Sequence, residues 1–321
     1  MNATACTYLR ISLTDRCDFN CFYCAPPASP RFLGQRSLLT REEVLILARL
    51  FCRHGIRHIR LTGGEPLLRR DLPFFVRKLS DAKALERISL TTNGHRLAGM
   101  AADLARRGVT HVNVSLDTLR PQRFAKMTGR DALDRVLAGI RAARRALRAA
   151  GQVKVNVLLI RGFNDDETVD FVTWGLAHGV TVRFIEYFPT SRRSRIFHGH
   201  FIATAEVKKT LEARFGRLEE AGFDPLGGPA HYARLGGEGA RVGFISSVTG
   251  SLCGRCNRLR LSADGKLYPC LHSDYNVDLA GPLRAGRTQE AAALIARAAA
   301  RKKELNKFVC SRDFAMSEIG G

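Results

Sequence analysis

The sequence predicts an α/β fold built around a parallel β-sheet. Over the first two thirds of the chain, short runs rich in β-branched residues alternate with segments of helical periodicity. Several of these runs are continuously apolar, as expected of strands buried on both faces of a parallel sheet. A glycine follows a predicted helix, and a strand begins within two residues, at Gly55, Gly108, Gly151 and Gly179. Such repeated helix–glycine–strand junctions are typical of serial βα units with right-handed crossovers.

Six strands are predicted from these runs, over residues 8–13, 56–62, 88–92, 109–115, 153–159 and 180–187. Helices lie between them. Thr40 and Glu43 form a capping box at the start of one helix, and Asn164 with Glu167 predicts a similar start for another. Six parallel strands can form a partial barrel or an open, doubly wound sheet, and periodicity does not separate the two.

The pattern changes after residue 187. A loop is predicted over 189–195 and a helix over 205–215, followed by a stretch rich in glycine and proline from 222 to 239. Short strands are predicted around 232–235, 241–245 and 258–261. We therefore place a domain boundary near residue 220, between an N-terminal segment, 1–220, and a C-terminal segment, 221–321.

Charge and cysteine content limit the classes of protein to consider. The 321 residues include 51 Lys and Arg against 30 Asp and Glu, a formal net charge of +21 that favours anionic partners. No apolar run approaches the roughly 20 residues that span a bilayer. The N-terminus lacks the basic start and apolar core of a secretory signal. The nine cysteines are therefore expected in a reducing compartment, where they do not form disulfides.

Three of these cysteines, Cys17, Cys21 and Cys24, directly follow the first predicted strand. Loops at the carboxyl ends of such strands form the active sites of α/β barrels. Three thiolates on one short loop can bind three irons of a cubane cluster, and without a fourth cysteine nearby one iron stays open to a small molecule. The alternatives are a zinc site completed by a distant residue, or plain buried thiols. Structural zinc sites usually pair two CxxC units, or one with histidines, so we favour the open cluster.

The segment from Arg16 to Cys24 resembles the cluster motif of the radical S-adenosylmethionine (SAM) enzymes, including the aromatic Tyr23 before the last cysteine. The sequence Gly63-Gly64-Glu65-Pro66, at the end of the second predicted strand, resembles the second motif of that superfamily. A glycine turn after a strand is a weak signal alone. When the turn lies one βα unit after the cysteine motif, the two together are a specific signal of that superfamily.

A second group, Cys253, Cys256 and Cys270, lies near the other end of the chain, with His272 two residues further on. By itself this spacing favours a zinc site with three cysteines and one histidine. The surrounding sequence, from Cys253 to Cys270, closely resembles the C-terminal cluster motif of the GTP 3′,8-cyclase family. The chain also ends in two glycines, as that family does. The resemblance runs from about residue 8 to the last residue.

This resemblance implies a partial (β/α)6 barrel of the TIM type over 1–220, closed by a C-terminal iron–sulfur domain over 221–321. It implies a radical SAM lyase that cyclises GTP to (8S)-3′,8-cyclo-7,8-dihydroguanosine 5′-triphosphate in molybdenum cofactor biosynthesis. The implied cofactors are SAM and two [4Fe–4S] clusters, each held by three cysteines. The first cluster binds SAM and the second holds the guanine.

Matching positions then supply the expected site residues. The expected cluster ligands are Cys17, Cys21, Cys24, Cys253, Cys256 and Cys270. The expected SAM contacts are Tyr23, Gly64, Ser115 and Phe188. The expected GTP contacts are Arg10, Arg60, Thr91, Lys154, Arg258, Leu259 and Arg260. The expected catalytic residues are Arg258, Arg260, Gly320 and Gly321. Two positions depart from the family pattern: Phe188 stands where methionine is common, and Asp18 where asparagine is usual.

The residues themselves support two of these assignments. Arg10 and Lys154 each lie within a predicted strand between apolar neighbours, where a buried charge needs an anionic partner. Other arginines carry weaker expectations. Arg192, Arg193 and Arg195 lie in a predicted loop and either reach a triphosphate or are solvated. A helical face of four arginines is expected to be solvent-exposed surface, at Arg141, Arg144, Arg145 and Arg148.

The resemblance also implies a cytoplasmic homodimer whose product passes to the cyclic pyranopterin monophosphate synthase, with neither nucleic acid nor membrane as a partner. The sequence does not indicate the electron donor. One alternative is a two-cluster radical SAM enzyme that modifies peptides, which requires neither Cys-x-Arg-x-Arg nor a Gly-Gly end. The other is a basic nucleic-acid-binding module with two structural zinc sites. That module explains the charge and both cysteine groups, but not the Gly-Gly-Glu-Pro turn or the βα series.

Overall fold

The computed structural model describes residues 6–24, 32–147, 151–187, 198–236, 240–250, 256–302 and 304–305. Some residues named above lie outside these ranges: Arg148, Phe188, Arg192, Arg193, Arg195, Cys253, Gly320 and Gly321. Among the described residues, no helix is long and apolar enough to cross a membrane.

A single sheet organises the protein, with the strand order β12-β11-β10-β1-β2-β3-β4-β5-β6-β9-β8-β7. The six predicted strands are confirmed as β1 (Tyr8–Ser12), β2 (His58–Thr62), β3 (Arg87–Thr92), β4 (His111–Ser115), β5 (Gln152–Leu159) and β6 (Thr181–Glu186). Each pairs in parallel with the next along the chain. The predicted series of βα units is therefore confirmed.

The C-terminal part of the chain extends this sheet at both edges. On one side β10 (Arg258–Leu261) pairs in parallel with β1, followed by antiparallel β11 (Lys266–Tyr268) and β12 (Val277–Asp278). On the other side β9 (Arg241–Ile245) pairs in parallel with β6, followed by antiparallel β8 (His231–Arg234) and β7 (Glu219–Phe223). Residue 220, chosen above as a boundary, lies inside β7.

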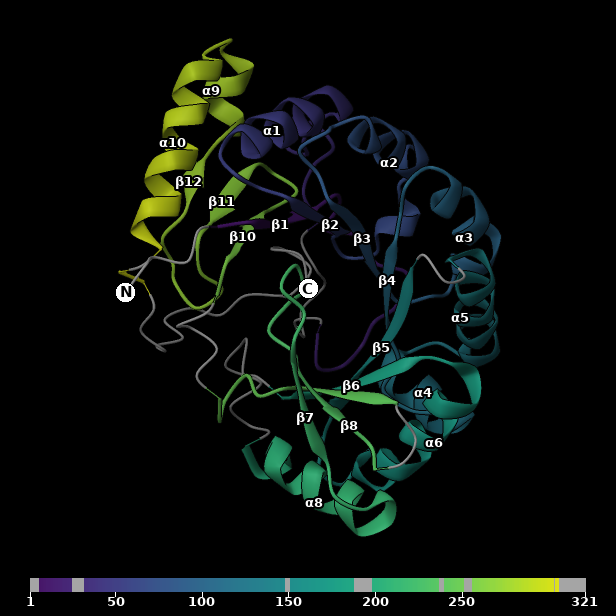
Figure 1. The fold of residues 1–321 in the computed structure, drawn as a ribbon. Helices are drawn as coiled ribbons and strands as arrows, with labels where there is room; N and C mark the ends of the chain where they lie inside the picture. The colour runs from purple at the N-terminus through teal and green to yellow at the C-terminus, as the bar shows by residue number, and fades with distance from the viewer. Residues whose placement is uncertain are drawn as a thin grey trace.

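Figure 1 shows the sheet curving around a central space with the helices on its outer side, which confirms the partial barrel. The α-helices are α1 (Arg41–Arg53), α2 (Leu72–Ser80), α3 (Leu97–Arg106), α4 (Pro121–Thr128), α5 (Leu133–Leu147), α6 (Thr168–His178), α8 (Thr204–Phe215), α9 (Ala280–Arg284) and α10 (Thr288–Arg301). Short 3₁₀ helices are η1 (Pro66–Leu68), η3 (Asp165–Glu167) and η4 (His198–His200).

Both predicted helix starts are present, but only the first has the predicted side-chain cap. At the start of α1, the Glu43 amide donates to Thr40 Oγ1 at 3.2 Å and the Thr40 amide donates to Glu43 Oε2 at 2.7 Å. Asn164 stands at the N-cap position of η3, which α6 follows at Thr168, but its side chain makes no capping hydrogen bond. Asn164 Nδ2 instead donates to the carbonyl oxygens of Asp117 and Leu158, at 2.6 and 2.8 Å. The side chain ties the loop after β4 to the end of β5, so it is not available to cap the helix.

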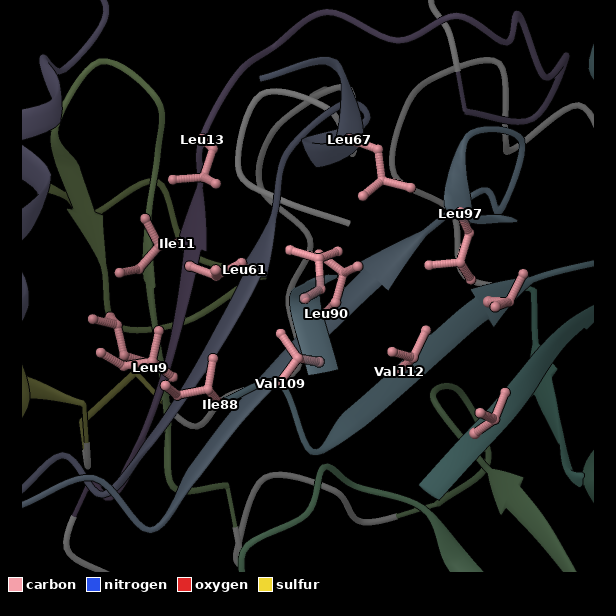
Figure 2. Close-up of a cluster of buried hydrophobic side chains, with 14 of the residues drawn as sticks. Leu9, Ile11, Leu13, Leu61, Leu67, Ile88, Leu90, Leu97, Val109 and Val112 are labelled. Carbon is pink, nitrogen blue, oxygen red and sulfur yellow. The ribbon is translucent and has the colours of Figure 1, made fainter. Parts of the chain in front are cut away.

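The hydrophobic core lies between the sheet and the helices. Along β1, Leu9 and Ile11 are fully buried on the helix side, and Figure 2 shows them beside Leu61 of β2 and Leu90 of β3. Because side chains alternate along a strand, Tyr8 and Arg10 point to the opposite face, into the barrel. The strands therefore separate an apolar outer layer from a polar interior.

The predicted glycine junctions are present. Gly55, Gly108 and Gly179 have φ values of 90°, 121° and 61°, in the left-handed range that glycine tolerates best. At Gly151 a Cβ atom would lie 2.4 Å from the carbonyl oxygen of Thr110, so close packing requires glycine there.

Candidate active site

A cavity of about 430 Å³ lies within the barrel, lined by residues of all eight parallel strands. Its lining includes Cys17, Cys21 and Cys24 together with Cys256 and Cys270. The loop of Cys17, Cys21 and Cys24 follows the carboxyl end of β1, whereas Cys256 precedes the amino end of β10, a parallel neighbour of β1. The two cysteine groups therefore lie at opposite ends of the strands, with the cavity between them.

The first cysteine group fits a cluster with three thiolate ligands. The Cys24 amide donates to the Cys21 carbonyl at 3.0 Å, which folds the loop into a turn. Burial raises the pKa of the Cys17 thiol to about 12, so its thiolate requires the positive charge of bound metal. Within the described residues, no three Cys, His, Asp or Glu side chains converge on a point where they could hold a single metal ion. Three thiolates that each bind a different iron need no such convergence.

Gly63 and Gly64 let the next turn pack directly on the chain leading to this loop. The Gly64 amide donates to the Thr14 carbonyl at 2.6 Å and the Glu65 amide to the Arg16 carbonyl at 2.7 Å. A Cβ atom on Gly64 would lie 2.2 Å from the Arg16 carbonyl oxygen. The second motif therefore acts structurally here, by fixing the approach to the cysteine loop.

Glu65 extends the same arrangement to β3. Its buried carboxylate accepts hydrogen bonds from the Leu67 amide at 2.9 Å, Thr92 Oγ1 at 2.7 Å and the Asn93 amide at 2.7 Å. Burial raises the pKa of Glu65 to about 7. The carboxyl end of β3 is thereby held against the Gly-Gly-Glu-Pro turn.

Asp18, which departs from the usual motif, has its own partners. Its Oδ1 accepts from Asn93 Nδ2 at 2.8 Å, and its Oδ2 lies 2.9 Å from His95 Nδ1 and 3.2 Å from Arg96 Nε. Burial alone would raise the pKa of Asp18, but the hydrogen bonds from His95, Asn93 and Arg96 lower it. Asn93 Nδ2 also lies 3.8 Å from Cys17 Sγ. The substitution is therefore accommodated by neighbours on the loop after β3.

Three residues expected to contact SAM lie in the cavity wall: Tyr23, Gly64 and Ser115. The Tyr23 hydroxyl donates to Asp117, whose other carboxylate oxygen accepts from the Leu158 amide at 2.8 Å. Burial raises the pKa of Asp117 to about 6. Asp117 was missed in the sequence, although it follows Ser115 at the end of an apolar strand.

Three arginines stand side by side on neighbouring strands. Arg10 of β1 is in register with Arg60 of β2 on one side and with Arg260 of β10 on the other, and all three line the cavity. Burial and the neighbouring arginines lower the pKa of Arg10 to about 10 and that of Arg260 well below its usual value. Like charges opposite one another destabilise a sheet. An anion bound in the cavity would relieve this repulsion.

Two further arginines, Arg183 and Arg258, also line the cavity. Arg183 Nε donates to Asn156 Oδ1 at 2.9 Å, and Arg60 Nη1 donates to Thr91 Oγ1 at 3.2 Å. These partners are neutral, so they leave the positive charge of the cavity in place. Arg183 was missed in the sequence, although it lies between the apolar Val182 and Phe184 just as Arg10 lies between Leu9 and Ile11.

The hydroxyl group of Tyr8 lies among these arginines. It accepts a hydrogen bond from Arg60 Nε. Burial would raise the pKa of Tyr8, but the charges of Arg60, Arg10 and Arg258 lower it to about 8. The sequence pattern did not identify Tyr8 as a site residue.

Two expected GTP contacts do not line the cavity. Leu259 is 1% exposed, and its side chain belongs to the hydrophobic core on the outer face of β10, away from the cavity. Lys154 is buried, and its Nζ lies 3.4 Å from Asp224 Oδ2. The position of Leu259 follows from the alternation of side chains along β10, and that of Lys154 from its ion pair with Asp224, a residue distant in the chain.

At the other end of the cavity, Cys256, Cys270 and His272 contribute to the lining. Burial would raise the pKa of the Cys256 thiol, but the charges of Arg258 and Lys302 lower it to about 6, which favours a thiolate ready to bind metal. Lys302 was missed in the sequence; its Nζ donates to the Pro269 carbonyl at 2.6 Å. The cavity thus has cysteine thiols at each end and a basic wall between them.

Comparison with family models gives two matches. The Radical SAM superfamily model matches residues 11–175, and the Molybdenum Cofactor Synthesis C model matches residues 180–308. Curated relatives named GTP 3′,8-cyclase cover nearly the whole chain. The relative from Heliobacterium modesticaldum is 40% identical over 319 residues, which is 98% of this chain and 97% of the relative. The relative from Moorella thermoacetica is 43% identical over 319 residues, with the same coverage of both chains.

Solved structures resemble the fold. Streptococcus suis SuiB bound to S-adenosylmethionine superposes with a TM-score of 0.57 at 12% identity, covering 87% of this chain and 64% of SuiB. SuiB bound to its precursor peptide SuiA gives a TM-score of 0.52 at 14% identity, covering 65% of this chain and 45% of that one. At such low identity the likeness concerns the fold alone.

Proposed function

This chain belongs to the GTP 3′,8-cyclase family of the radical SAM superfamily, and we propose that it catalyses the radical cyclisation of GTP to (8S)-3′,8-cyclo-7,8-dihydroguanosine 5′-triphosphate. The observation that carries the proposal is the row of Arg10, Arg60 and Arg260 in a cavity between two cysteine groups. A polyphosphate is the ligand that such a row suits, since arginine forks match phosphate oxygens in pairs.

We infer that Cys17, Cys21 and Cys24 hold the first [4Fe–4S] cluster, and that Cys253, Cys256 and Cys270 hold the second. When bound, the first cluster and SAM supply an electron and a 5′-deoxyadenosyl radical that removes hydrogen from C3′ of GTP. Tyr23, Gly64 and Ser115 would hold SAM beside the first cysteine loop. Phe188, outside the described residues, is proposed to face the adenine.

The basic wall would position GTP between the two cofactor sites. Arg10, Arg60 and Arg260 line the cavity and would bind the phosphates, and Thr91 accepts a hydrogen bond from the Arg60 guanidinium. Arg258, beside Cys256, would orient the guanine end with the backbone of Leu259. Lys154 is proposed to bind the phosphate chain as well. Such fixed positions favour cyclisation, because the sugar and base of one molecule must meet in a single geometry.

Further features of the proposal rest on the family. Arg258, Arg260, Gly320 and Gly321 are proposed as catalytic residues, with the two terminal glycines entering the cavity. The product is proposed to pass to the cyclic pyranopterin monophosphate synthase in a molybdenum cofactor pathway. We also propose a cytoplasmic homodimer, and a division between a barrel over 1–220 and an iron–sulfur domain over 221–321.

The test is anaerobic turnover. Reconstituted protein, which we expect to hold about eight irons in two cubane clusters, is mixed with reductant, SAM and GTP, and the products are followed by mass spectrometry. We expect 5′-deoxyadenosine and the cyclised nucleotide to increase together. Colourless protein that holds zinc would refute the proposal, and 5′-deoxyadenosine that does not rise when GTP is added would refute the choice of substrate.

Deletion of Gly321 tests the proposed role of the tail. We expect the truncated protein to lose cyclisation and to keep both clusters, measured by iron content and product analysis. Full activity without Gly321 would show that the tail has no role in the reaction.

A further inference from the structure

Lys154 shares a half-buried carboxylate, Asp224, with Arg87. Asp224 Oδ2 lies 3.4 Å from Lys154 Nζ and 2.6 Å from Arg87 Nη1. The side chains are 7%, 17% and 15% exposed for Lys154, Asp224 and Arg87, so solvent screens these pairs weakly. Asp224 lies in the C-terminal segment, 70 residues after Lys154.

Asp224 belongs to a segment that forms part of the cavity wall. It lies between β7 and β8, in the stretch that also contributes Gly228 and Pro229 to the lining. His58 Nδ1 donates to the Leu226 carbonyl at 2.5 Å, which fastens this segment to β2. Asp224 is thus held in place beside the cavity by contacts other than its own ion pairs.

Lys154 is within reach of the cavity. On β5 it shares a face with Asn156 and Leu158, both of which line the cavity, and its backbone pairs with Asn113, which also lines it. Two residues along a strand correspond to about 6.6 Å. The flexible four-carbon stem of a lysine spans a distance of that order. The Lys154 ammonium can therefore lie beside Asp224 or turn toward a ligand in the cavity.

The other groups around Lys154 do not replace Asp224 as its counter-ion. Tyr232 is a second partner: its ring centre lies 5.3 Å from Nζ, and its hydroxyl oxygen accepts a hydrogen bond from the ammonium. Burial and Arg183 on the neighbouring strand lower the pKa of Lys154, whereas Tyr232 and Asp224 raise it. Tyr232 is a phenol, so Asp224 is the carboxylate of this group. Burial and nearby cations lower the pKa of His111 to about 3, so this histidine is neutral at physiological pH. Asp224 supplies one negative charge that Lys154 and Arg87 share.

We propose that Asp224 is a positioning residue for substrate binding, and that a phosphate oxygen of GTP competes with it for Lys154. This inference rests on the proposed function, because it assumes a polyphosphate in the cavity. When the phosphate chain binds, Lys154 leaves Asp224 and turns into the cavity, while Arg87 remains the partner of Asp224. No bond is made or broken; an ion pair inside the protein is exchanged for one with the ligand.

The proposal predicts whether each of two substitutions strengthens or weakens GTP binding. Asp224→Asn removes both the competitor for Lys154 and a negative charge beside the anion site, so GTP should bind more tightly, by roughly three- to tenfold. Arg87→Gln leaves Asp224 with Lys154 as its remaining partner, so GTP should bind more weakly by a similar factor. A residue that merely fastens the segment would weaken GTP binding when either partner is lost.

Equilibrium binding to the anaerobically reconstituted protein tests these signs, with GTP, guanosine and inorganic triphosphate as separate probes. The gain from Asp224→Asn should appear with GTP and with triphosphate, and not with guanosine. It should disappear in a Lys154→Met background, because the exchange operates through that ammonium. Asp224→Glu, which keeps the charge, should bind GTP as the wild type does.

Asp103→Asn is the matched control. It removes a carboxylate that is ion-paired with Arg106 and Arg107 on α3, away from the cavity lining. Its affinity for GTP should equal that of the wild type. Weaker or unchanged GTP binding by Asp224→Asn, or a gain that persists in the Lys154→Met background, would overturn the inference. If the wild type fails to cyclise GTP, the proposed function itself is wrong, which is a separate outcome.

Discussion

Replacing Gly64 with alanine tests how the Gly-Gly-Glu-Pro turn supports the first cysteine loop. The new Cβ atom would lie 2.2 Å from the Arg16 carbonyl oxygen, 2.5 Å from its carbonyl carbon and 2.8 Å from the Asp15 carbonyl oxygen. All three atoms are backbone, so no side chain can rotate away. An ordinary contact begins at 3.4 Å, so the turn and the loop must separate by about 1.2 Å, the difference between 3.4 Å and 2.2 Å.

That separation breaks two short hydrogen bonds. The Gly64 amide donates to Thr14 at 2.6 Å and the Glu65 amide to Arg16 at 2.7 Å, and both become too long after a movement of this size. Each bond contributes about 1 kcal/mol, and overpacking adds about 1–3 kcal/mol. We expect a loss of about 3–5 kcal/mol in the free energy of unfolding, which lowers the melting temperature by about 4–7 °C for a chain of this length.

Two measurements follow the effect, and both avoid activity, since Gly64 is also a proposed SAM contact. Thermal unfolding followed by circular dichroism reports stability, and iron analysis after anaerobic reconstitution reports cluster binding. Gly64→Ala should hold fewer irons than the wild type, because its cysteine loop is displaced. The matched control is Gly99→Ala in α3, where a Cβ atom meets nothing within 4 Å. Helix propensity makes that substitution neutral or stabilising, by up to about 1 kcal/mol.

A Gly64→Ala protein with the melting temperature and iron content of the wild type would refute this reasoning. It would mean that the turn and the loop can separate without cost, and that glycine is required at this position only for contact with SAM.

Three other predictions concern the clusters and the charges. Cys21→Ala and Cys256→Ala should each remove about four of about eight irons, since each group holds one cubane; loss of all the iron from either variant would show that the two sites do not assemble independently. Arg260→Met should stabilise substrate-free protein by about 1 kcal/mol, because it relieves repulsion from Arg10, and should therefore raise the melting temperature while GTP binding falls. A lower melting temperature would contradict this account of the arginine row. The pKa of Asp224 is lowered to about 2, although burial alone would raise it, because Arg87 and Lys154 stabilise the carboxylate. Its ion pairs should therefore add about 2 kcal/mol to the free energy of unfolding above pH 4, and this contribution should be lost as the pH falls toward 2. Urea unfolding should then show that the difference in stability between wild type and Asp224→Asn shrinks between pH 4 and pH 2.

Much of the fold could be predicted from local pattern. The six strands and the glycine junctions were readable because apolar runs and helix ends are encoded by neighbouring residues. Asn164 shows the limit of that approach: it stands at the start of a helix, but its side chain binds carbonyl groups on the loop after β4 and on β5. A local rule fails where a side chain finds better partners in a distant segment.

The cysteine groups and the Gly-Gly-Glu-Pro turn carried most of the functional identification. They are short segments in which spacing alone restricts the chemistry, so the expected ligands could be named one by one. Their relative placement could not be, because it depends on β10 running parallel to β1 with Cys256 at its amino end. That strand direction sets the two groups at opposite ends of one cavity.

What the sequence alone determined is which residues carry charge and where strands begin and end. Only the tertiary structure decided which charges meet. Strand register placed Arg10 between Arg60 and Arg260, and alternation along β10 turned Leu259 into the core. A chain segment 70 residues away brought Asp224 to Lys154. Each outcome depends on pairing between strands or loops distant in sequence, and electrostatic interactions act through space whatever the separation along the chain.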